Sequence, residues 1–223
     1  GVVIRDVQMF YKQQHELELN KVCVWVDPLD GTNGFCSGNL DEITVLIGLS
    51  YEGKARLGII GVPYYRDEHH NLVYCPKIIY GDASNMVYEL AQNGNISQLP
   101  QPSTTKEIRL IGSKHRSQKL DETLAQISPC VVSIGGCGAK FIRLLGSEFN
   151  SIVNLSNKSS RWDTCAGHAI ISALGGVVCT LQGTEISYEE SSCPTNEQGF
   201  VCLMNRELLP QVLAVTCNFE IEG

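Results

Sequence analysis

Residues 22–32 read VCVWVDPLDGT, an apolar run that ends in two carboxylates and a glycine. The first five residues are apolar and mostly β-branched or aromatic, a composition that predicts a short, fully buried β-strand. We expect the strand to stop at Asp27-Pro28, because proline has no amide hydrogen to donate to a β-ladder. Glycine can adopt backbone angles that other residues avoid, so Gly31 permits a tight turn directly after the strand.

This turn can direct four oxygen-bearing groups toward one point: the carboxylates of Asp27 and Asp30, the Leu29 carbonyl and the Thr32 hydroxyl. Two carboxylates held close together repel each other unless a cation lies between them. Oxygen ligands of this kind suit Mg²⁺ better than zinc. The alternative is a simple Asp-Gly turn with a helix cap. The hexapeptide alone leaves both interpretations open.

The segments that follow predict a hairpin and then a linker. Residues 43–49 and 55–62 have strand composition, and they flank a turn at residues 51–54 that contains a glycine. Residues 92–106 are rich in Gln, Asn, Ser, Thr and Pro and poor in apolar side chains, which indicates a linker between domains.

Beyond this linker, strand and helix patterns alternate, which indicates a layered α/β arrangement. We expect strands at 108–111, 131–134, 151–155 and 177–181, and helices at 119–127, 140–145 and 163–174. The predicted division is the C-terminal portion of an N-terminal α+β metal-binding domain over residues 1–105, then a C-terminal α/β substrate-binding domain over residues 106–223.

A second motif, WDTCAG at residues 162–167, opens the helix predicted from residue 163. Asp163 can cap that helix by accepting hydrogen bonds from its free amides. An aspartate beside the free amides of a helix N-terminus can also hold a cation and a phosphate together. Both roles remain open from this motif alone.

Two further stretches carry cationic side chains beside glycines or hydroxyls. Residues 135–140 read GGCGAK, so backbone amides near Gly136 can approach a phosphate closely, and Lys140 can supply a positive charge. Residues 113–117 read SKHRS and follow a predicted strand. The alternative for residues 135–140 is an ordinary connection between a strand and a helix, and the alternative for residues 113–117 is a solvated surface turn. Arg161, just before the second motif, is a further cationic side chain, and the alternative for it is an ordinary exposed arginine.

The composition excludes some classes of function. The chain has 223 residues and a net charge of −7, which argues against a general nucleic-acid-binding protein with a basic face. No run approaches the ~18 apolar residues of a membrane span, so we expect a soluble protein. Ten cysteines without a C-x-x-C pair predict buried, reduced thiols and a cytoplasmic location. Three N-x-S tripeptides, at Asn95, Asn154 and Asn157, leave a lumenal location open.

Taken together, the turn at residues 27–32 and the later WDTCA helix start resemble the signature of the lithium-sensitive, magnesium-dependent phosphomonoesterase superfamily. Its members include inositol monophosphatases, fructose-1,6-bisphosphatases and bisphosphate nucleotidases. The resemblance implies an α/β (α+β) layered sandwich of the inositol monophosphatase/fructose-1,6-bisphosphatase type, with its N-terminal part missing. It also implies that Asp27, the Leu29 carbonyl, Asp30 and Asp163 bind two or three Mg²⁺ ions, and that Thr32 orients the attacking water.

Within the superfamily, residues 22–178 are most similar to the 3'(2'),5'-bisphosphate nucleotidases. The similarity implies a monomer that hydrolyses the 3'-phosphate of adenosine 3',5'-bisphosphate. The residues that it implies in substrate binding are Gly31, Thr32, Ser113, His115, Arg116, Gly136, Lys140 and Arg161. Arg116 stands where the family has a histidine, and His115 lies one position earlier, so either side chain can make that contact. An upstream Gly-Glu-Glu motif of the family is absent before residue 22. An inositol phosphate phosphatase and an inactive metal- or nucleotide-binding fragment are therefore the alternatives.

Overall fold

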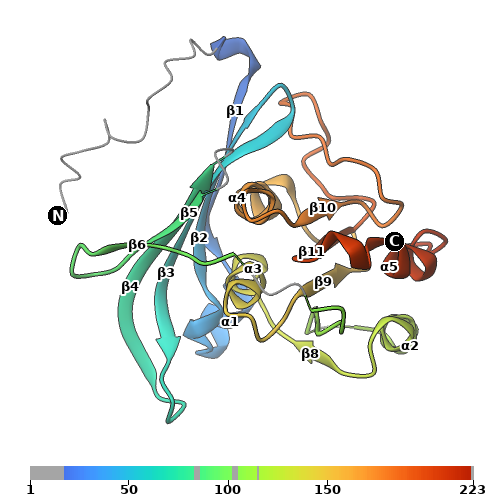
Figure 1. Cartoon of the computed structure of the whole chain (residues 1–223), viewed down its shortest axis with the longest axis horizontal. Helices are drawn as coiled ribbons and strands as arrows, with labels where there is room; N and C mark the ends of the chain where they lie inside the picture. The colour runs from blue at the N-terminus through green and yellow to red at the C-terminus, as the bar shows by residue number, and fades with distance from the viewer. Residues whose placement is uncertain (1–17, 83–85, 102–104, 115, 222–223) are drawn as a thin grey trace.

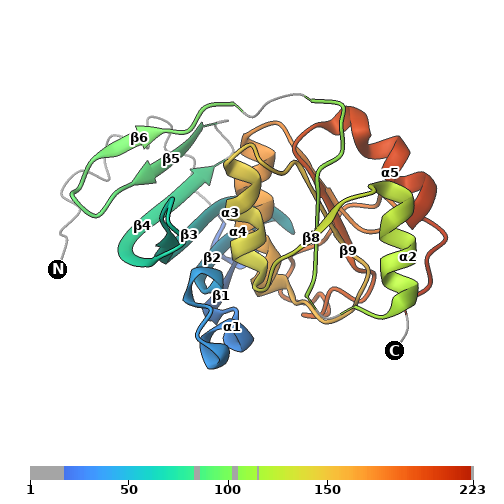
Figure 2. The ribbon, with the colours of Figure 1, turned by 90° about the horizontal axis from the view of Figure 1, so that it is seen from below.

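The computed structural model of the protein describes residues 18–82, 86–101, 105–114 and 116–221. Its strands form two sheets, and Figures 1 and 2 show helices α3 and α4 between them, with α2 and α5 on the far side of the second sheet. The predicted layered α/β class is therefore confirmed.

The first sheet is antiparallel and follows chain order. Its strands are β1 (Val22–Asp30), β2 (Thr44–Tyr51), β3 (Lys54–Arg66), β4 (Leu72–Asp82), β5 (Met86–Leu90) and β6 (Ile96–Gln98). The predicted hairpin is β2 and β3, both longer than expected. Part of the predicted linker is wrong, because β6 lies within it and pairs with β5. An exposed edge strand needs no apolar face, so its polar composition hid it.

The second sheet has the strand order β10-β11-β9-β7-β8. Its strands are β7 (Leu110–Gly112), β8 (Val131–Ser133), β9 (Ser151–Asn154), β10 (Val177–Cys179) and β11 (Phe200–Leu203). Strand β7 pairs in parallel with β8 and β9, whereas β11 pairs antiparallel with β9 and β10. Four of these strands match the predicted strands within two residues at each end, whereas β11 lies outside every predicted strand.

The α-helices are α1 (Thr32–Ser37), α2 (Gln118–Ile127), α3 (Cys137–Leu145), α4 (Arg161–Ala173) and α5 (Leu209–Thr216), and single 3₁₀ turns span Leu19–Lys21, Leu40–Glu42 and Arg206–Leu208. The predicted helices correspond to α2, α3 and α4. Across the described residues, no helix is both long enough and apolar enough to cross a membrane.

Helix α4 packs with its backbone directly on the first sheet. A Cβ atom placed on Gly58 of β3 would lie 2.0 Å from the Ala166 carbonyl oxygen, and one on Gly48 of β2 would lie 2.6 Å from the Cys165 Cβ. Glycine is therefore required at both positions for this close approach. The close approach brings the N-terminal turn of α4 toward the end of β1.

One apolar cluster joins the two sheets through the helices between them. It includes Leu46 and Ile60 from the first sheet, Phe141 and Ile170 from the intervening helices, and Phe200 from the second sheet. The division into two domains at residues 105 and 106 stays a prediction. Both sheets nevertheless contribute side chains to this cluster.

All ten cysteines are free thiols. The prediction that they are buried holds for Cys137, Cys165, Cys179 and Cys202. It is wrong for Cys36, Cys130, Cys193 and Cys217, which are exposed because they lie in short helices, turns or loops outside the strands.

Candidate metal centre

Strand β1 does not stop at Pro28, as predicted, but continues through an irregularity to Asp30. Asp27 pairs with Leu46 and Asp30 pairs with Thr44. Between these two pairs, β1 therefore contains one residue more than β2. An extra residue of this kind is a β-bulge, where proline is tolerated. Because side chains alternate between faces, the extra residue turns Asp27 and Asp30 toward the same side.

The Asp30 carboxylate is almost completely buried and accepts three hydrogen bonds, which leaves one acceptor position on Oδ1. Its Oδ1 accepts from the Cys137 amide at 2.9 Å. Its Oδ2 accepts from the Gly138 amide at 2.7 Å and from the Thr44 hydroxyl at 2.8 Å. Both amides belong to the first turn of α3. The end of β1 is thereby joined to the glycine run of the second half of the chain.

Asp163 occupies the third position of α4 and accepts a hydrogen bond from the Ser160 amide through Oδ2 at 2.6 Å. The N-cap of α4 is therefore Ser160 and not Asp163, as the alternative from the sequence had it, and Asp163 takes part in a capping box around Ser160. Asp163 also approaches the two aspartates of β1. One ligand oxygen from each of Asp27, Asp30 and Asp163 lies within 4.8 Å of the others. We call these three residues the acidic triad.

The acidic triad concentrates negative charge that the protein does not neutralise. Burial raises the pKa of Asp30, and it raises the pKa of Asp163 to about 7, where the negative charges of Asp30 and Asp27 add to the effect. Across the described residues, lysines and arginines form ion pairs with other carboxylates and with none of these three. Carboxylates with a raised pKa gain from a nearby positive charge. Three carboxylates that converge through oxygen atoms suit a hard divalent cation.

Two glycines beside the triad have left-handed backbones. Gly31 has φ of +81° and Gly136 has φ of +67°. A Cβ atom on either one would lie 2.3 Å from the Glu42 carbonyl oxygen. The tight turn predicted at Gly31 is confirmed. The Glu42 backbone leaves no room for a side chain at either position, a contact that sequence patterns did not reveal.

The remaining predicted ligands of the first motif lie next to the triad. Leu29 lies within the bulge, and its amide donates to Asp27 Oδ1 at 3.0 Å. Thr32 is the first residue of α1, and its side chain is exposed to solvent. Both positions are compatible with the predicted roles in metal and water binding, which stay predictions.

Lys140 is 7% exposed, and its ammonium group donates to the Ser113 hydroxyl at 3.0 Å. In the part of the chain that the structure describes, Lys140 forms no ion pair with a carboxylate. A buried ammonium group without a counter-charge is costly. An anionic ligand beside Lys140 and Ser113 would lower that cost.

The side chain of Arg116 is held by the protein itself. Its Nε donates to Asp121 at 2.6 Å, and its Nη1 donates to the Ser133 hydroxyl at 2.9 Å and to the Ser113 carbonyl. The choice between Arg116 and His115 as the substrate contact stays open, because His115 lies outside the described residues.

Arg161 begins α4 and is held by a residue that sequence reasoning missed. Its Nη1 donates to Oδ1 of Asn196, which is 1% exposed. The Asn196 amide group in turn donates to the Ser160 carbonyl at 2.8 Å and to the Ser159 hydroxyl at 3.1 Å. Asn196 lies in a polar loop whose sequence carries no periodic signal. Only the folded chain brings it against the start of α4.

The comparison with protein families agrees with this arrangement. Residues 4–216 match the sequence model of the inositol monophosphatase family. The chain belongs to the inositol monophosphatase family. The superfamily resemblance inferred from the two motifs is thus confirmed, and the acidic triad is the candidate metal centre of a family member.

Individual members of the family are similar over most of this chain. The human 3'(2'),5'-bisphosphate nucleotidase 1 is 33% identical over 193 residues, which cover 86% of this chain and 60% of the relative. The chain thus spans about 60% of that relative's length. The structure of the Zymomonas mobilis inositol monophosphatase has a TM-score of 0.65 and 17% identity, covering 88% of this chain and 70% of that one. An IMPase/NADP phosphatase complexed with Mg²⁺ and phosphate has a TM-score of 0.64 and 19% identity, covering 92% and 70%. These two structures share the fold.

Proposed function

We propose that this chain forms the metal- and substrate-binding part of a Mg²⁺-dependent phosphomonoesterase. Its proposed reaction is the hydrolysis of the 3'-phosphate of adenosine 3',5'-bisphosphate to AMP and phosphate, with 3'-phosphoadenosine 5'-phosphosulfate as a further substrate. The observation that carries the proposal is the acidic triad: three carboxylates lie within 4.8 Å of one another, and among the described residues no lysine or arginine forms an ion pair with them. The complex of a fold relative with Mg²⁺ and phosphate supports the choice of Mg²⁺.

The oxygen-bearing residues of the turn, together with Asp163 of α4, have proposed roles in the reaction. Asp27, Asp30 and Asp163, with the Leu29 carbonyl, would hold Mg²⁺, which when bound activates water and stabilises charge on the phosphate oxygens. The Thr32 hydroxyl would hold the attacking water by a hydrogen bond. In the hydrolysis, the water oxygen bonds to phosphorus, the bond from phosphorus to the 3' oxygen breaks, and that oxygen gains a proton.

Substrate selection is assigned to the segment around α3. Lys140 would bind the 5'-phosphate, because it is a buried cation that forms no ion pair with any carboxylate of the described residues. Ser113, Gly136, Arg116 and Arg161 would line the nucleotide site, together with Gly31. The 33% identity to a bisphosphate nucleotidase supports a nucleotide over an inositol phosphate.

The direct experiment measures phosphate release by the chain in Mg²⁺ from adenosine 3',5'-bisphosphate and from inositol 1-phosphate. We expect preference for the nucleotide and inhibition by millimolar lithium. Preference for inositol 1-phosphate would overturn the substrate assignment. Binding of Mg²⁺ and nucleotide without turnover would instead favour a non-catalytic binding chain.

Metal binding is tested separately by calorimetry on Asp30→Asn and Asp163→Asn. Each variant should lose most of its Mg²⁺ affinity while remaining folded. Glu68→Gln is a matched control, because that carboxylate is 86% exposed in the turn between β3 and β4. If Asp163→Asn lowered the free energy of unfolding but kept the Mg²⁺ affinity of the folded protein, the capping-box contact would be the sole role of Asp163.

A further inference from the structure

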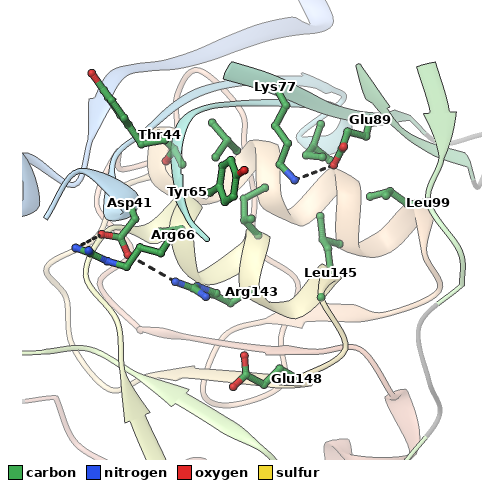
Figure 3. A pocket seen from close by; sticks show the side chains of 16 residues that line it. Asp41, Thr44, Tyr65, Arg66, Lys77, Glu89, Leu99, Arg143, Leu145 and Glu148 are labelled. Carbon is green, nitrogen blue, oxygen red and sulfur yellow. Dashed lines mark hydrogen bonds and ion pairs between the residues drawn. The ribbon is translucent and has the colours of Figure 1, made fainter. Parts of the chain in front are cut away.

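A cavity with a volume of about 390 Å³ lies between the inner face of the first sheet and α3, apart from the acidic triad. Sites for small molecules usually have volumes of ~300–1,000 Å³. The cavity is lined from β3, β4 and β5 on one side and from α3 on the other, as Figure 3 shows. Most of its lining residues belong to strands and to α3, and the others lie in the segments next to them.

The floor of this cavity is apolar. Val62 and Ile79 lie on adjacent strands and are 6% and 2% exposed, and Ile142 and Leu145 face them from α3. Leu99 adds an apolar wall beyond β6. A ring or a short aliphatic body would replace water against these side chains, and removing apolar surface from water favours binding.

One end of the cavity carries an excess positive charge. Asp41 faces two guanidinium groups: Arg66 Nη2 lies 3.0 Å from Oδ1, and Arg143 Nη2 lies 3.7 Å from Oδ2. The single negative charge of Asp41 therefore offsets only one of the two positive charges on these arginines. The distance of 3.7 Å exceeds a hydrogen bond, and the Arg143 side chain is 44% exposed. Arg143 thus keeps donors for an incoming oxygen.

The other charges around the cavity do not cancel this excess locally. Lys77 and Glu89 form a neutral pair at 2.8 Å. In Figure 3, Glu148 lies apart from Arg143, on the segment that follows α3. A guanidinium group with free donors binds carboxylates and phosphates through paired hydrogen bonds. The arrangement of charge and apolar surface therefore selects a ligand with an anionic group on an apolar body.

We propose that this cavity binds a small organic anion, an apolar ring or chain that carries one carboxylate or phosphate. The anionic group lies on Arg143, and the apolar body lies against Val62, Ile79 and Leu145. The proposal does not depend on the proposed phosphatase function, because none of the acidic triad lines this cavity. The two sites share a wall, since Thr44 lines the cavity and also donates to Asp30.

The first experiment uses 1-naphthoate and its neutral analogue 1-naphthylmethanol as probes. Both are titrated into the full chain without divalent metal, so that the acidic triad cannot bind the carboxylate through a cation. We expect saturable binding of 1-naphthoate at one site, with shifts of the Val62 and Ile79 methyl resonances. The neutral analogue should bind about tenfold to hundredfold more weakly, because it lacks the charge-assisted contact. Absence of saturable binding would overturn the proposal.

Two variants distinguish the contribution of the Arg143 charge to binding from the contribution of the cavity volume. Arg143→Gln should weaken 1-naphthoate binding by about tenfold to hundredfold and leave the neutral analogue unchanged, with Asp41 still paired to Arg66. Gly146→Phe should block both probes by filling the cavity. Gly146 tolerates a side chain, since its φ is −79° and an added Cβ meets nothing closer than 3.7 Å.

The matched control is Arg56→Gln, which removes an exposed arginine of β3 that does not line the cavity. It should bind both probes as the unmodified chain does. Thermal unfolding establishes that each variant is folded. Unchanged 1-naphthoate affinity in folded Arg143→Gln and Gly146→Phe would show that the anion binds elsewhere, and the proposal would fail.

Discussion

The Gly138 amide donates a 2.7 Å hydrogen bond to Oδ2 of Asp30, across 108 positions of the chain. The positive end of the α3 dipole favours a carboxylate at this position, which offsets part of the cost of burying Asp30. A Cβ atom on Gly138 would lie 2.2 Å from the Thr44 hydroxyl, so glycine keeps the contact possible. The end of β1 and the start of α3 are therefore held as one unit, and Lys140 has a defined position relative to the acidic triad.

Replacing Asn196 with alanine tests how the start of α4 is held. The substitution removes the donors to the Ser160 carbonyl and the acceptor for Arg161. Because the Ser160 amide binds Asp163, we expect the triad to lose its geometry. Calorimetry should show Mg²⁺ affinity reduced by about tenfold, and urea unfolding should show a loss of about 1–3 kcal/mol.

Asn205→Ala is the control for that experiment. Asn205 is also buried, caps the turn that follows it through the Glu207 amide at 3.0 Å and donates to the Thr105 carbonyl. Its loss should destabilise the protein to a similar extent without changing Mg²⁺ affinity. Equal loss of Mg²⁺ affinity in both variants would mean that Asn196 acts through global stability alone.

The close packing of β3 on α4 predicts a large effect from one methyl group. Gly58→Ala would place its Cβ 2.0 Å from the Ala166 carbonyl oxygen, which belongs to helix backbone and cannot rotate away. We expect a loss of about 3 kcal/mol in the free energy of unfolding. Gly61→Ala in the same strand should be nearly neutral, because its Cβ meets only Val45 at 3.5 Å. Urea titrations that gave the same change for both variants would show that the contact with α4 does not set the requirement for glycine at Gly58.

The resemblance of the two motifs to the phosphomonoesterase superfamily predicted the three aspartates of the acidic triad, whereas each motif alone left the metal-binding role open. The sequence did not predict the bulge at Pro28, since the register of β1 on β2 depends on pairing with residues of another strand. The contacts of Glu42 and Asn196 were hidden for the same reason: each depends on a backbone or loop brought close only by tertiary packing. Edge strand β6 was missed because two exposed faces impose no apolar pattern.

Acidification should destabilise the protein partly through His168. Desolvation, and then the charge of Arg206, lower the pKa of His168 to about 4, and its ring packs on Tyr188 with a 3.1 Å hydrogen bond. The unfolded chain takes up this proton near pH 6.5, so the stabilisation is complete above that pH. It is lost as the pH falls from 6.5 to 4, by roughly 3 kcal/mol in total.

The measurement is urea unfolding of the unmodified chain and of His168→Gln between pH 4 and 7.5. Their difference in the free energy of unfolding should shrink steadily below pH 6.5, because glutamine does not titrate. A difference that stays constant across this range would show that His168 carries the same charge in both states.

The last prediction separates recognition of the substrate from its chemistry. Lys140→Ala removes a buried cation that is proposed to bind the 5'-phosphate, a group that is not cleaved. KM for adenosine 3',5'-bisphosphate should therefore rise by about tenfold to hundredfold, with kcat falling less, as expected when uniform binding is lost. The Kd of AMP, which keeps the 5'-phosphate, should rise by the same factor, whereas adenosine 3'-phosphate should be hydrolysed almost as before. Lys54→Ala is the control, because Lys54 is exposed and lies 3.6 Å from Glu185 in a surface ion pair. Equal damage on both substrates would mean that Lys140 supports the structure or the reacting phosphate, and the assignment of the 5'-phosphate site would be withdrawn.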